Sequence, residues 1–144
     1  MTNILIIEDE PDISMVLQVY LEKAGFSTKQ AYNGKLALDL FEQWKPSLVL
    51  LDIMLPDMDG WVILKRIREQ SSCPVIMLSA LGDVKSRLEG LNEGADDYIC
   101  KPFVAEEVVA RVKTVLRRMP QVVTDDTAIF GNLKINFASR EVSF

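Results

Sequence analysis

The chain has 144 residues, of which 49% are hydrophobic, and its formal net charge is −5, from 16 Lys and Arg against 21 Asp and Glu. A hydrophobic fraction of this size excludes intrinsic disorder, and the acidic balance makes residues 1–120 a poor candidate for direct contact with nucleic acid. The sequence contains no His, which excludes His-based acid–base catalysis and His metal ligands.

Short aliphatic runs alternate with segments whose apolar residues recur at helical spacing along the first 120 residues. The second run is the most polar, which is typical of an edge strand. The predicted strands cover residues 4–7, 26–31, 48–51, 75–78 and 98–100. The predicted helices carry apolar residues within 13–24, 36–41, 63–67, 88–91 and 108–116. Five strand-then-helix units with short connections predict an α/β fold, a parallel sheet with helices on both faces.

The pattern changes beyond Arg118. Residues 121–128 are polar and patternless, which predicts a linker. In residues 129–144 apolar side chains alternate with polar ones, which predicts a two-stranded hairpin with one buried face. A lone hairpin is marginally stable in water, so we expect the native polypeptide to continue. The predicted organisation is one domain over 1–120, a linker, and the truncated start of a second domain.

Chemically active side chains follow four of the five predicted strands. The first is followed by Glu8-Asp9-Glu10, the third by Asp52, the fourth by Ser79-Ala80 and the fifth by Lys101-Pro102. Because the carboxyl ends of parallel strands meet at one edge of a sheet, we expect these groups to lie close together. Carboxylates packed together repel one another, which favours a bound cation, and oxygen ligands suit Mg²⁺ or Mn²⁺.

This combination predicts phosphoryl chemistry. Asp52 would act as a nucleophile toward phosphorus, while Lys101 neutralises one phosphoryl oxygen and Ser79 donates a hydrogen bond to another. A single Asp after a strand is more often a helix cap or a solvated charge, and Glu10 and Asp12 are expected to be such residues. Because four positions fit phosphoryl transfer together, we prefer this interpretation to one of unrelated helix caps and solvated charges.

Asp57-Met58-Asp59-Gly60 has some likeness to a calcium-binding loop. It lacks the third acidic position and the Glu six residues after the Gly, so a calcium site is rejected.

The motifs over residues 1–120 resemble the receiver domain of two-component response regulators. The segments that carry the resemblance are residues 6–10, 50–56, 78–80 and 94–103. The resemblance implies a flavodoxin-like (CheY-like), doubly wound sheet of five parallel strands in the order 2-1-3-4-5. It also implies that Asp52 is the phospho-acceptor, and that Lys101 binds the phosphoryl group. The implied metal ligands are Glu8, Asp9, Asp52 and the backbone carbonyl of Met54.

The resemblance further implies a switch formed by Ser79 and Tyr98, and a cis peptide bond between Lys101 and Pro102. Two departures from the family pattern concern the lifetime of the phosphorylated state. Ser79 stands where Thr is commoner, and Leu81 stands where a polar or basic residue is frequent.

Three further segments, 87–91, 96–98 and 107–118, resemble the OmpR/PhoB branch of the family. This likeness implies a two-fold dimer through the fourth helix, fifth strand and fifth helix. The implied apolar contacts are Leu88, Leu91 and Ala110, and the implied ion pairs are Arg87 with Glu107 and Asp97 with Arg111. Residues 129–144 resemble the first strands of that branch's winged-helix DNA-binding domain.

The sequence therefore predicts a response regulator that receives a phosphoryl group from a sensor histidine kinase and controls transcription through a DNA-binding domain largely absent from this chain. It is predicted to turn over no metabolite, apart from its own phosphorylation and dephosphorylation. No apolar run is long enough to span a membrane and no secretory signal is present, so we expect a cytoplasmic protein without membrane contact.

Three alternatives were weighed. A stand-alone receiver that signals by docking to another protein is disfavoured by the hairpin at 129–144. A phosphatase of the haloacid-dehalogenase kind needs a second Asp two residues after the nucleophile, where this chain has Met54. A flavin or dinucleotide binder needs a Gly-rich turn after the first strand, and the acidic residues found there would repel a phosphate.

Overall fold

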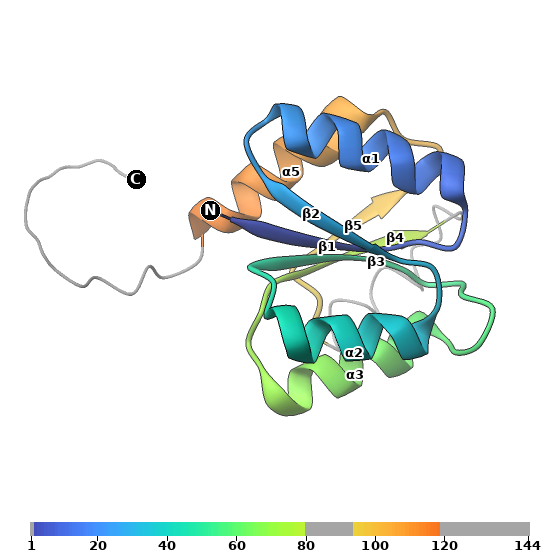
Figure 1. Cartoon of the computed structure of the whole chain (residues 1–144). Coiled ribbons are helices and arrows are strands. Elements are labelled where there is room, and N and C mark those ends of the chain that lie inside the picture. Colours follow the sequence, from blue (N-terminus) through green and yellow to red (C-terminus); the bar gives the residue numbers. More distant parts are fainter. Residues whose placement is uncertain (1, 80–93, 119–144) are drawn as a thin grey trace, which may run out of the picture.

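A five-stranded parallel sheet separates two helical layers, with α1 and α5 on one face and α2 and α3 on the other (Figure 1). The computed structural model describes residues 2–79 and 94–118. The strand order is β2-β1-β3-β4-β5, which confirms the predicted fold class and order. The strands are β1 (Asn3–Ile7), β2 (Ser27–Ala31), β3 (Leu48–Asp52), β4 (Val75–Ser79) and β5 (Asp97–Cys100). The helices are α1 (Pro11–Lys23), α2 (Gly34–Trp44), α3 (Gly60–Gln70) and α5 (Ala105–Arg118).

The central strands form a core on both faces of the sheet. Their side chains alternate between the two helical layers, which explains why β1, β3 and β4 are continuous apolar runs. The set packed with α2 and α3 includes Leu5, Ile7, Val49, Leu51, Val75 and Met77. The set packed with α5 and α1 includes Ile4, Ile6, Leu48, Leu50, Ile76 and Leu78. Each such side chain contributes about 1.5–3 kcal/mol relative to its exposed state.

The strand boundaries differ from the predicted ones by single residues. β1 and β5 begin one residue before the apolar run and β3 and β4 end one residue after it, because the hydrogen-bond ladder does not depend on side-chain polarity. The amide of Ile53 still donates to the carbonyl of Leu78 (3.0 Å) beyond β3. β2 is the polar edge strand that was predicted, with only Ala31 buried. The predicted helix around Leu88 and Leu91, the linker at 121–128 and the hairpin at 129–144 lie outside the described residues.

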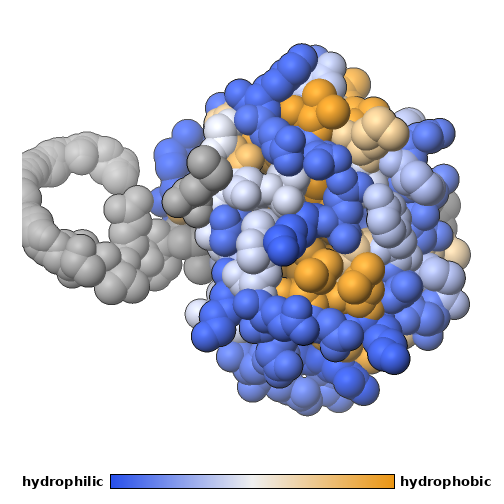
Figure 2. Space-filling model, in the orientation of Figure 1, coloured by the Kyte–Doolittle hydropathy of each residue, from blue (hydrophilic) through white to orange (hydrophobic). Residues whose placement is uncertain are grey.

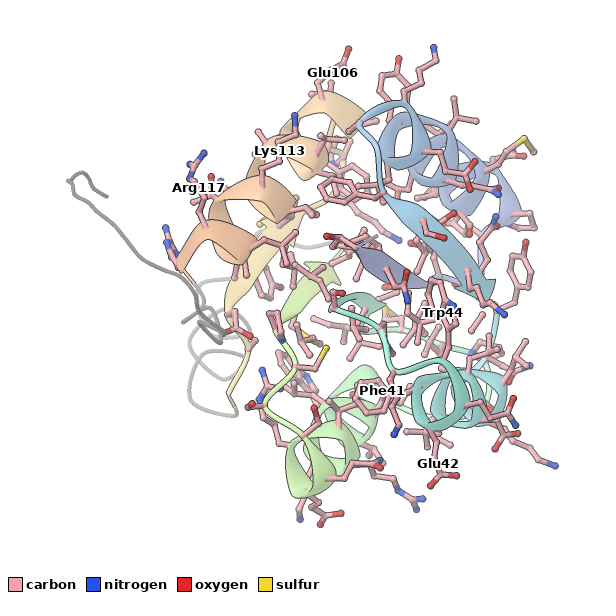
Figure 3. All side chains as sticks on the ribbon, turned by 60° about the vertical axis from the view of Figure 1, so that its left-hand side comes forward. Phe41, Glu42, Trp44, Glu106, Lys113 and Arg117 are labelled. Atoms are coloured by element: carbon pink, nitrogen blue, oxygen red, sulfur yellow. The ribbon has the colours of Figure 1, made fainter. Side chains whose placement is uncertain are left out.

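The helices are amphipathic, as the periodicity predicts. On α2, Phe41 points toward the sheet and Glu42 points away from it (Figure 3). On α5, Glu106, Lys113 and Arg117 lie on the outer surface (Figure 3). The buried face of α5 consists of Ala105, Val108, Val112 and Val115.

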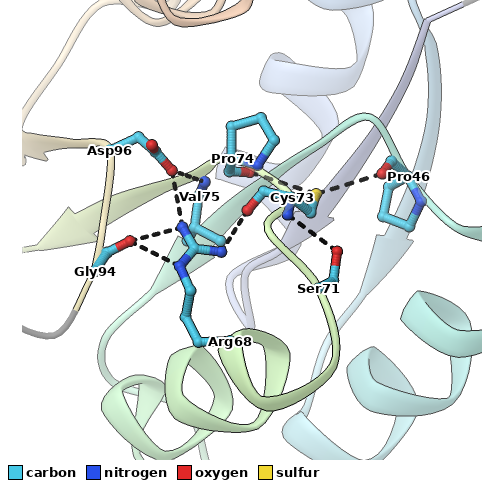
Figure 4. A network of polar contacts seen from close by, with 8 residues as sticks. All are labelled: Pro46, Arg68, Ser71, Cys73, Pro74, Val75, Gly94 and Asp96. Atoms are coloured by element: carbon cyan, nitrogen blue, oxygen red, sulfur yellow. Dashed lines mark hydrogen bonds and ion pairs between the residues drawn. The ribbon is translucent and has the colours of Figure 1, made fainter. Parts of the chain in front are cut away.

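A polar network joins α3 to the amino ends of β4 and β5 (Figure 4). The guanidinium of Arg68 donates to the carbonyl of Gly94 through Nε (2.9 Å) and Nη2 (2.6 Å), and to the carbonyl of Cys73 through Nη1. It also pairs with the Asp96 carboxylate at 2.9 Å, which accepts the Val75 amide at 2.8 Å. We call these five residues the Arg68 network; they hold the segments that precede β4 and β5 against α3.

The face shown in Figure 2 is mostly hydrophilic, with hydrophobic atoms gathered near α1 and near α2. On α1 the exposed apolar side chains are Met15, Val16, Val19 and Tyr20. Among the described residues, no helix combines the length and the apolar character needed to cross a membrane.

Candidate functional site at the carboxyl edge of the sheet

Three carboxylates meet where β1 and β3 end, as the sequence predicts. Glu8 and Asp9 follow β1, and Asp52 is the last residue of β3. The parallel register of Ile7 with Leu51 brings these strand ends side by side. One oxygen from each of the three carboxylates lies within 4.8 Å of the other two. We call Glu8, Asp9 and Asp52 the acidic cluster.

The acidic cluster is unusual because much of its charge is buried. Glu8 is fully buried and Asp52 is 4% exposed. Burial raises the pKa of Glu8 to about 7; the neighbouring Lys101 ammonium lowers this pKa and the Asp52 charge raises it further. Since burial is the main cause of this shift, the site disfavours the charged form of Glu8 even with the Lys101 ammonium beside it.

Lys101, just after β5, supplies the positive charge at this edge. Its Nζ lies 2.9 Å from Glu8 Oε1 and 3.4 Å from Asp52 Oδ2. Burial alone would lower the pKa of Lys101, but Glu8 and Asp52 raise it above its ordinary value, so the side chain is an ammonium ion. The predicted cis peptide bond between Lys101 and Pro102 is confirmed.

Glu10 lies closer to the site than the sequence interpretation allowed. It is the N-cap residue of α1, which agrees with the prediction of a helix-end residue, yet its side chain makes no capping hydrogen bond. Instead its Oε1 lies 3.6 Å from Lys101 Nζ. The signal for this was the unbroken acidic run after the first strand. Asp12, by contrast, is exposed in the first turn of α1, as expected.

The residues present fit a hard divalent cation. At least three carboxylates face one ammonium group, and a cation beside them would favour the charged form of Glu8, which burial disfavours. The backbone of Met54 lies beside them, because its amide donates to Asp52 Oδ1 at 3.2 Å. Oxygen donors from two strand ends and an adjacent loop are the ligand type that Mg²⁺ prefers.

The two predicted switch residues lie on β4 and β5. Leu78 is paired with Asp52 in the ladder, so the backbone of Ser79 is next to the acidic cluster, but the side chain of Ser79 is outside the described part of the structure. Tyr98 is 6% exposed and belongs to the core between the sheet and the layer of α2 and α3. Ser79 is itself paired with Cys100.

The predicted dimer residues are described only in part. Arg111 on α5 pairs with Asp97 of the same chain at 3.1 Å and with Glu107 at 3.5 Å. The contact with Asp97 raises the pKa of Arg111. Ala110 is exposed beside them. Three further predicted residues, Arg87, Leu88 and Leu91, lie outside the described residues.

The fold and this site define a class of protein, and comparison with known families agrees. The model of the response regulator receiver domain matches residues 4–113. The chain therefore belongs to the response regulator receiver domain family. This membership confirms the predicted resemblance to receiver domains, which are not a classical enzyme family.

Several known relatives of this chain are named as transcriptional regulators. The chain is 47% identical over 142 residues to the "Probable transcriptional regulator ycf27" of Guillardia theta, which covers 98% of this chain and 56% of that protein. The curated relatives include OmpR/PhoB-like transcriptional regulators. Across those compared, the chain spans between 52% and 60% of the relative's length.

Solved structures show the same fold. A two-component response regulator from Clostridium difficile matches with a TM-score of 0.80 at 39% identity, covering 84% of this chain and all of that chain (100%). The receiver domain of Klebsiella pneumoniae RstA, activated with beryllofluoride, matches with a TM-score of 0.77 at 32% identity, covering 81% of this chain and 100% of that one.

Proposed function

We propose that this domain receives a phosphoryl group on Asp52 from a sensor histidine kinase, in a reaction that depends on Mg²⁺ or Mn²⁺. The observation that carries the proposal is the acidic cluster, whose oxygens lie within 4.8 Å of one another, with the Lys101 ammonium 3.4 Å from Asp52. A structural charge network would balance its charges. This one leaves an excess of carboxylates in a buried place, which suits a site that binds a cation and a phosphoryl group in succession.

The residues of the chain divide the chemistry among them. Glu8, Asp9, Asp52 and the backbone carbonyl of Met54 would hold the cation, which supplies charge neutralisation between carboxylate and phosphoryl group. One Asp52 oxygen attacks phosphorus, a new O–P bond forms, and the bond from phosphorus to the donor breaks with its electron pair leaving on the donor, the imidazole of a phosphohistidine. Lys101 compensates the charge on a phosphoryl oxygen.

The output is a change in conformation and association. The phosphoryl group would accept a hydrogen bond from the Ser79 hydroxyl and draw it closer. The side chain of Tyr98, on the neighbouring strand, would then change its position. This shifts the equilibrium toward a dimer through the surface that carries Asp97, Ala110 and Arg111. Supporting this output, a structural relative was crystallised as a beryllofluoride-activated receiver domain.

The full protein is proposed to regulate transcription. Residues 1–120 form the receiver, 121–128 a linker, and 129–144 the start of a DNA-binding domain. The support is that the curated relatives are named as transcriptional regulators and are longer than this chain. DNA contact would belong to that second domain, because residues 1–120 are acidic and would repel a phosphate backbone.

Acetyl phosphate provides a direct test of the phospho-acceptor. The chain is incubated with acetyl phosphate and Mg²⁺, and its intact mass is followed with time. We expect one phosphoryl group, removed by hydroxylamine as an acyl phosphate is, and no labelling of Asp52→Asn. The matched control is Asp39→Asn on the exposed surface of α2, which should label like the wild type. Labelling of Asp52→Asn at the wild-type rate would refute the assignment.

Beryllofluoride, which mimics a phosphoryl group on aspartate, tests the output. With Mg²⁺ it should convert the monomer to a dimer in sedimentation experiments. A chain that binds beryllofluoride but stays monomeric would favour the alternative, a stand-alone receiver that docks to another protein. Lys101→Ala should retain metal binding and yet fail to dimerise, because no ammonium group would contact the phosphoryl oxygen and couple phosphorylation to the change in conformation.

A further inference from the structure

The Asp57 carboxylate joins two segments that lie far apart in the sequence. It belongs to the loop between β3 and α3, yet its Oδ1 accepts from the amide of Gly34 at 2.7 Å and its Oδ2 from the amide of Lys35 at 3.0 Å. These amides are the first two of α2, where a helix has unpaired donors. The Gly34 amide is also the main cause that lowers the pKa of Asp57, so the carboxylate is ionised.

Met58 adds an apolar contact at the same place. A Cβ on Gly34 would overlap the Sδ atom of Met58, at 2.6 Å, so the helix start and the loop tip are packed without space between them. Met58 is itself half-buried against the core. The tip of the loop, residues 55–58, is thus held on α2 by a two-pronged carboxylate and a methionine side chain.

The base of the same loop is fixed on the acidic cluster. The amide of Gly60 donates to the carbonyl of Ile53 at 2.7 Å, and Met54 forms a bridge with Asp59. A Cβ on Gly60 would lie 2.5 Å from the carbonyl oxygen of Asp52, so the start of α3 also abuts the end of β3. Met54 belongs to this base, and its amide also donates to Asp52.

We propose that Asp57 is a positioning residue, which acts by holding the loop tip on α2 and thereby keeps the Met54 backbone against Asp52. This inference rests on the proposed function, since it gives Asp57 a role in the phosphorylation of Asp52. The attachment of the tip on α2 adds to the restraint that the base places on Met54. Without the attachment at the tip, the Met54 amide and carbonyl sample more positions, and the site is less preorganised for cation and phosphoryl group.

The local chemistry argues against a metal ion at Asp57 itself. Both of its oxygens already accept backbone amides, and a helix N-terminus favours an anion, not a cation. Asp59 is likewise occupied, because its Oδ1 caps α3 through the amide of Trp61 at 2.8 Å. The acidic pair that has some likeness to a calcium loop therefore consists of two helix caps, one local and one long-range.

The experiment compares Asp57→Asn with Asn33→Ala. Asn and Asp have nearly the same shape, but the Asn side chain replaces one acceptor oxygen with an NH2 donor, so the separate bonds from Gly34 to Oδ1 and from Lys35 to Oδ2 cannot both be kept. Asn33 caps the same helix through the amide of Leu36 (2.8 Å), and among the described residues its side chain makes no hydrogen bond to the loop. Its removal therefore weakens the start of α2 without releasing the loop tip. Both variants are made in the full 144-residue chain.

Three measurements distinguish positioning from general stability. Amide hydrogen exchange at Met54 is followed by NMR in the metal-free chain, Mg²⁺ affinity by calorimetry, and the rate of labelling by acetyl phosphate at saturating Mg²⁺ by intact mass. Asp57→Asn should speed exchange at Met54, weaken Mg²⁺ binding, and slow labelling about tenfold or more. Asn33→Ala should leave all three close to wild type.

The outcomes separate this inference from the proposed function. If the wild-type chain is not labelled on Asp52 at all, the proposed function fails first. If the wild type is labelled and Asp57→Asn matches it in exchange, affinity and rate, the positioning role is refuted. Equal losses in Asp57→Asn and Asn33→Ala also overturn it, because the effect would then come from the stability of α2.

Discussion

The two ends of the sheet carry polar clusters that are built in opposite ways. At the carboxyl edge, Glu8 and Asp52 share the Lys101 ammonium, and the pKa of Glu8 is raised to about 7. At the amino edge, each of the three guanidinium nitrogens of Arg68 donates to an acceptor, and Asp96 also accepts a backbone amide. The same kinds of groups thus form an unbalanced cluster at one end and a balanced one at the other.

The two clusters differ in whether binding a proton, a cation or a phosphoryl group from outside the chain can stabilise them. The Arg68 network gains its stability from partners within the chain, so adding an ion or a proton can only weaken it. The acidic cluster lacks enough internal positive charge, so a proton, a cation or a phosphoryl group changes its energy strongly. An excess of like charge in a buried place lowers stability, and this is the physical sign of a site that binds something from outside.

The largest expected effect comes from removing the cation that pairs with Glu8 and Asp52 at the carboxyl edge. Lys101→Met keeps the aliphatic stem and deletes the charge, leaving Glu8 and Asp52 without their ammonium partner. At about pH 8 and without metal, we expect a loss of about 4 kcal/mol in the free energy of unfolding. Urea denaturation measures it, and Mg²⁺ should recover part of the loss because a cation replaces the missing charge.

The matched control is Lys113→Met, on the outer surface of α5 (Figure 3). It should change the free energy of unfolding by less than about 0.5 kcal/mol and should not alter the response to Mg²⁺. A Lys101→Met chain as stable as this control would contradict the view that the cluster carries uncompensated charge.

A substitution in the Arg68 network at the amino edge should also lower the stability of the fold, but Mg²⁺ should not restore it. Arg68→Ala removes the partner of the Asp96 carboxylate and of the Gly94 and Cys73 carbonyls. We expect a loss of about 2–3 kcal/mol in the free energy of unfolding, because the half-buried Cys73 carbonyl loses its donor and the Asp96 carboxylate loses its charged partner. Urea titrations with and without Mg²⁺ should give the same loss. If Mg²⁺ restores stability here as it does for Lys101→Met, the contrast between the two edges is lost.

Much of this contrast could be predicted from the sequence, because local patterns determine it. The aliphatic runs gave the strands, the residue after each run gave Glu8, Asp52 and Lys101, and parallel strands bring such positions together. The fold order came from the resemblance and is confirmed. The roles of Asp52, Ser79 and Tyr98 remain predictions, since geometry alone places groups and does not show their chemistry.

Long-range polar pairs could not be predicted, since no periodicity marks them. Ser14 is fully buried in α1 because its hydroxyl donates to Gln30 on β2 at 2.7 Å, which an apolar pattern would not suggest. Arg68 was not singled out in the sequence, and Asp57 was considered only as part of a rejected calcium loop. Each gained its partner only when segments distant in the sequence met in the fold.

The titration of Glu8 gives a smaller effect that sharpens the comparison. Its pKa is raised to about 7, so between its ordinary pKa and 7 the folded chain keeps a proton that the unfolded chain has lost. Stability contributed by that proton is present at low pH and is lost as pH rises toward 8. Glu8→Gln should therefore match the wild type near about pH 5 and exceed it by about 2 kcal/mol near pH 8, without metal. A difference that does not change with pH would show that Glu8 is not the titrating group.

The smallest expected effect on stability concerns the pair of Asp97 and Arg111. The Arg111 side chain is 42% exposed and that of Asp97 is 23% exposed, so Arg111→Ala should cost the monomer less than about 1 kcal/mol. In the proposed dimer Arg111 would exchange its own Asp97 for that of the second copy, and the contact would then be buried from solvent. We expect Arg111→Ala to weaken the beryllofluoride-induced dimer about tenfold or more in sedimentation experiments, whereas Lys113→Ala on the same helix should not. Because the ion pair already exists within one chain, its net contribution to dimer affinity is the difference between two pairs. A strong effect on the dimer with almost none on the monomer would show that this surface, unlike either edge of the sheet, is arranged for a partner.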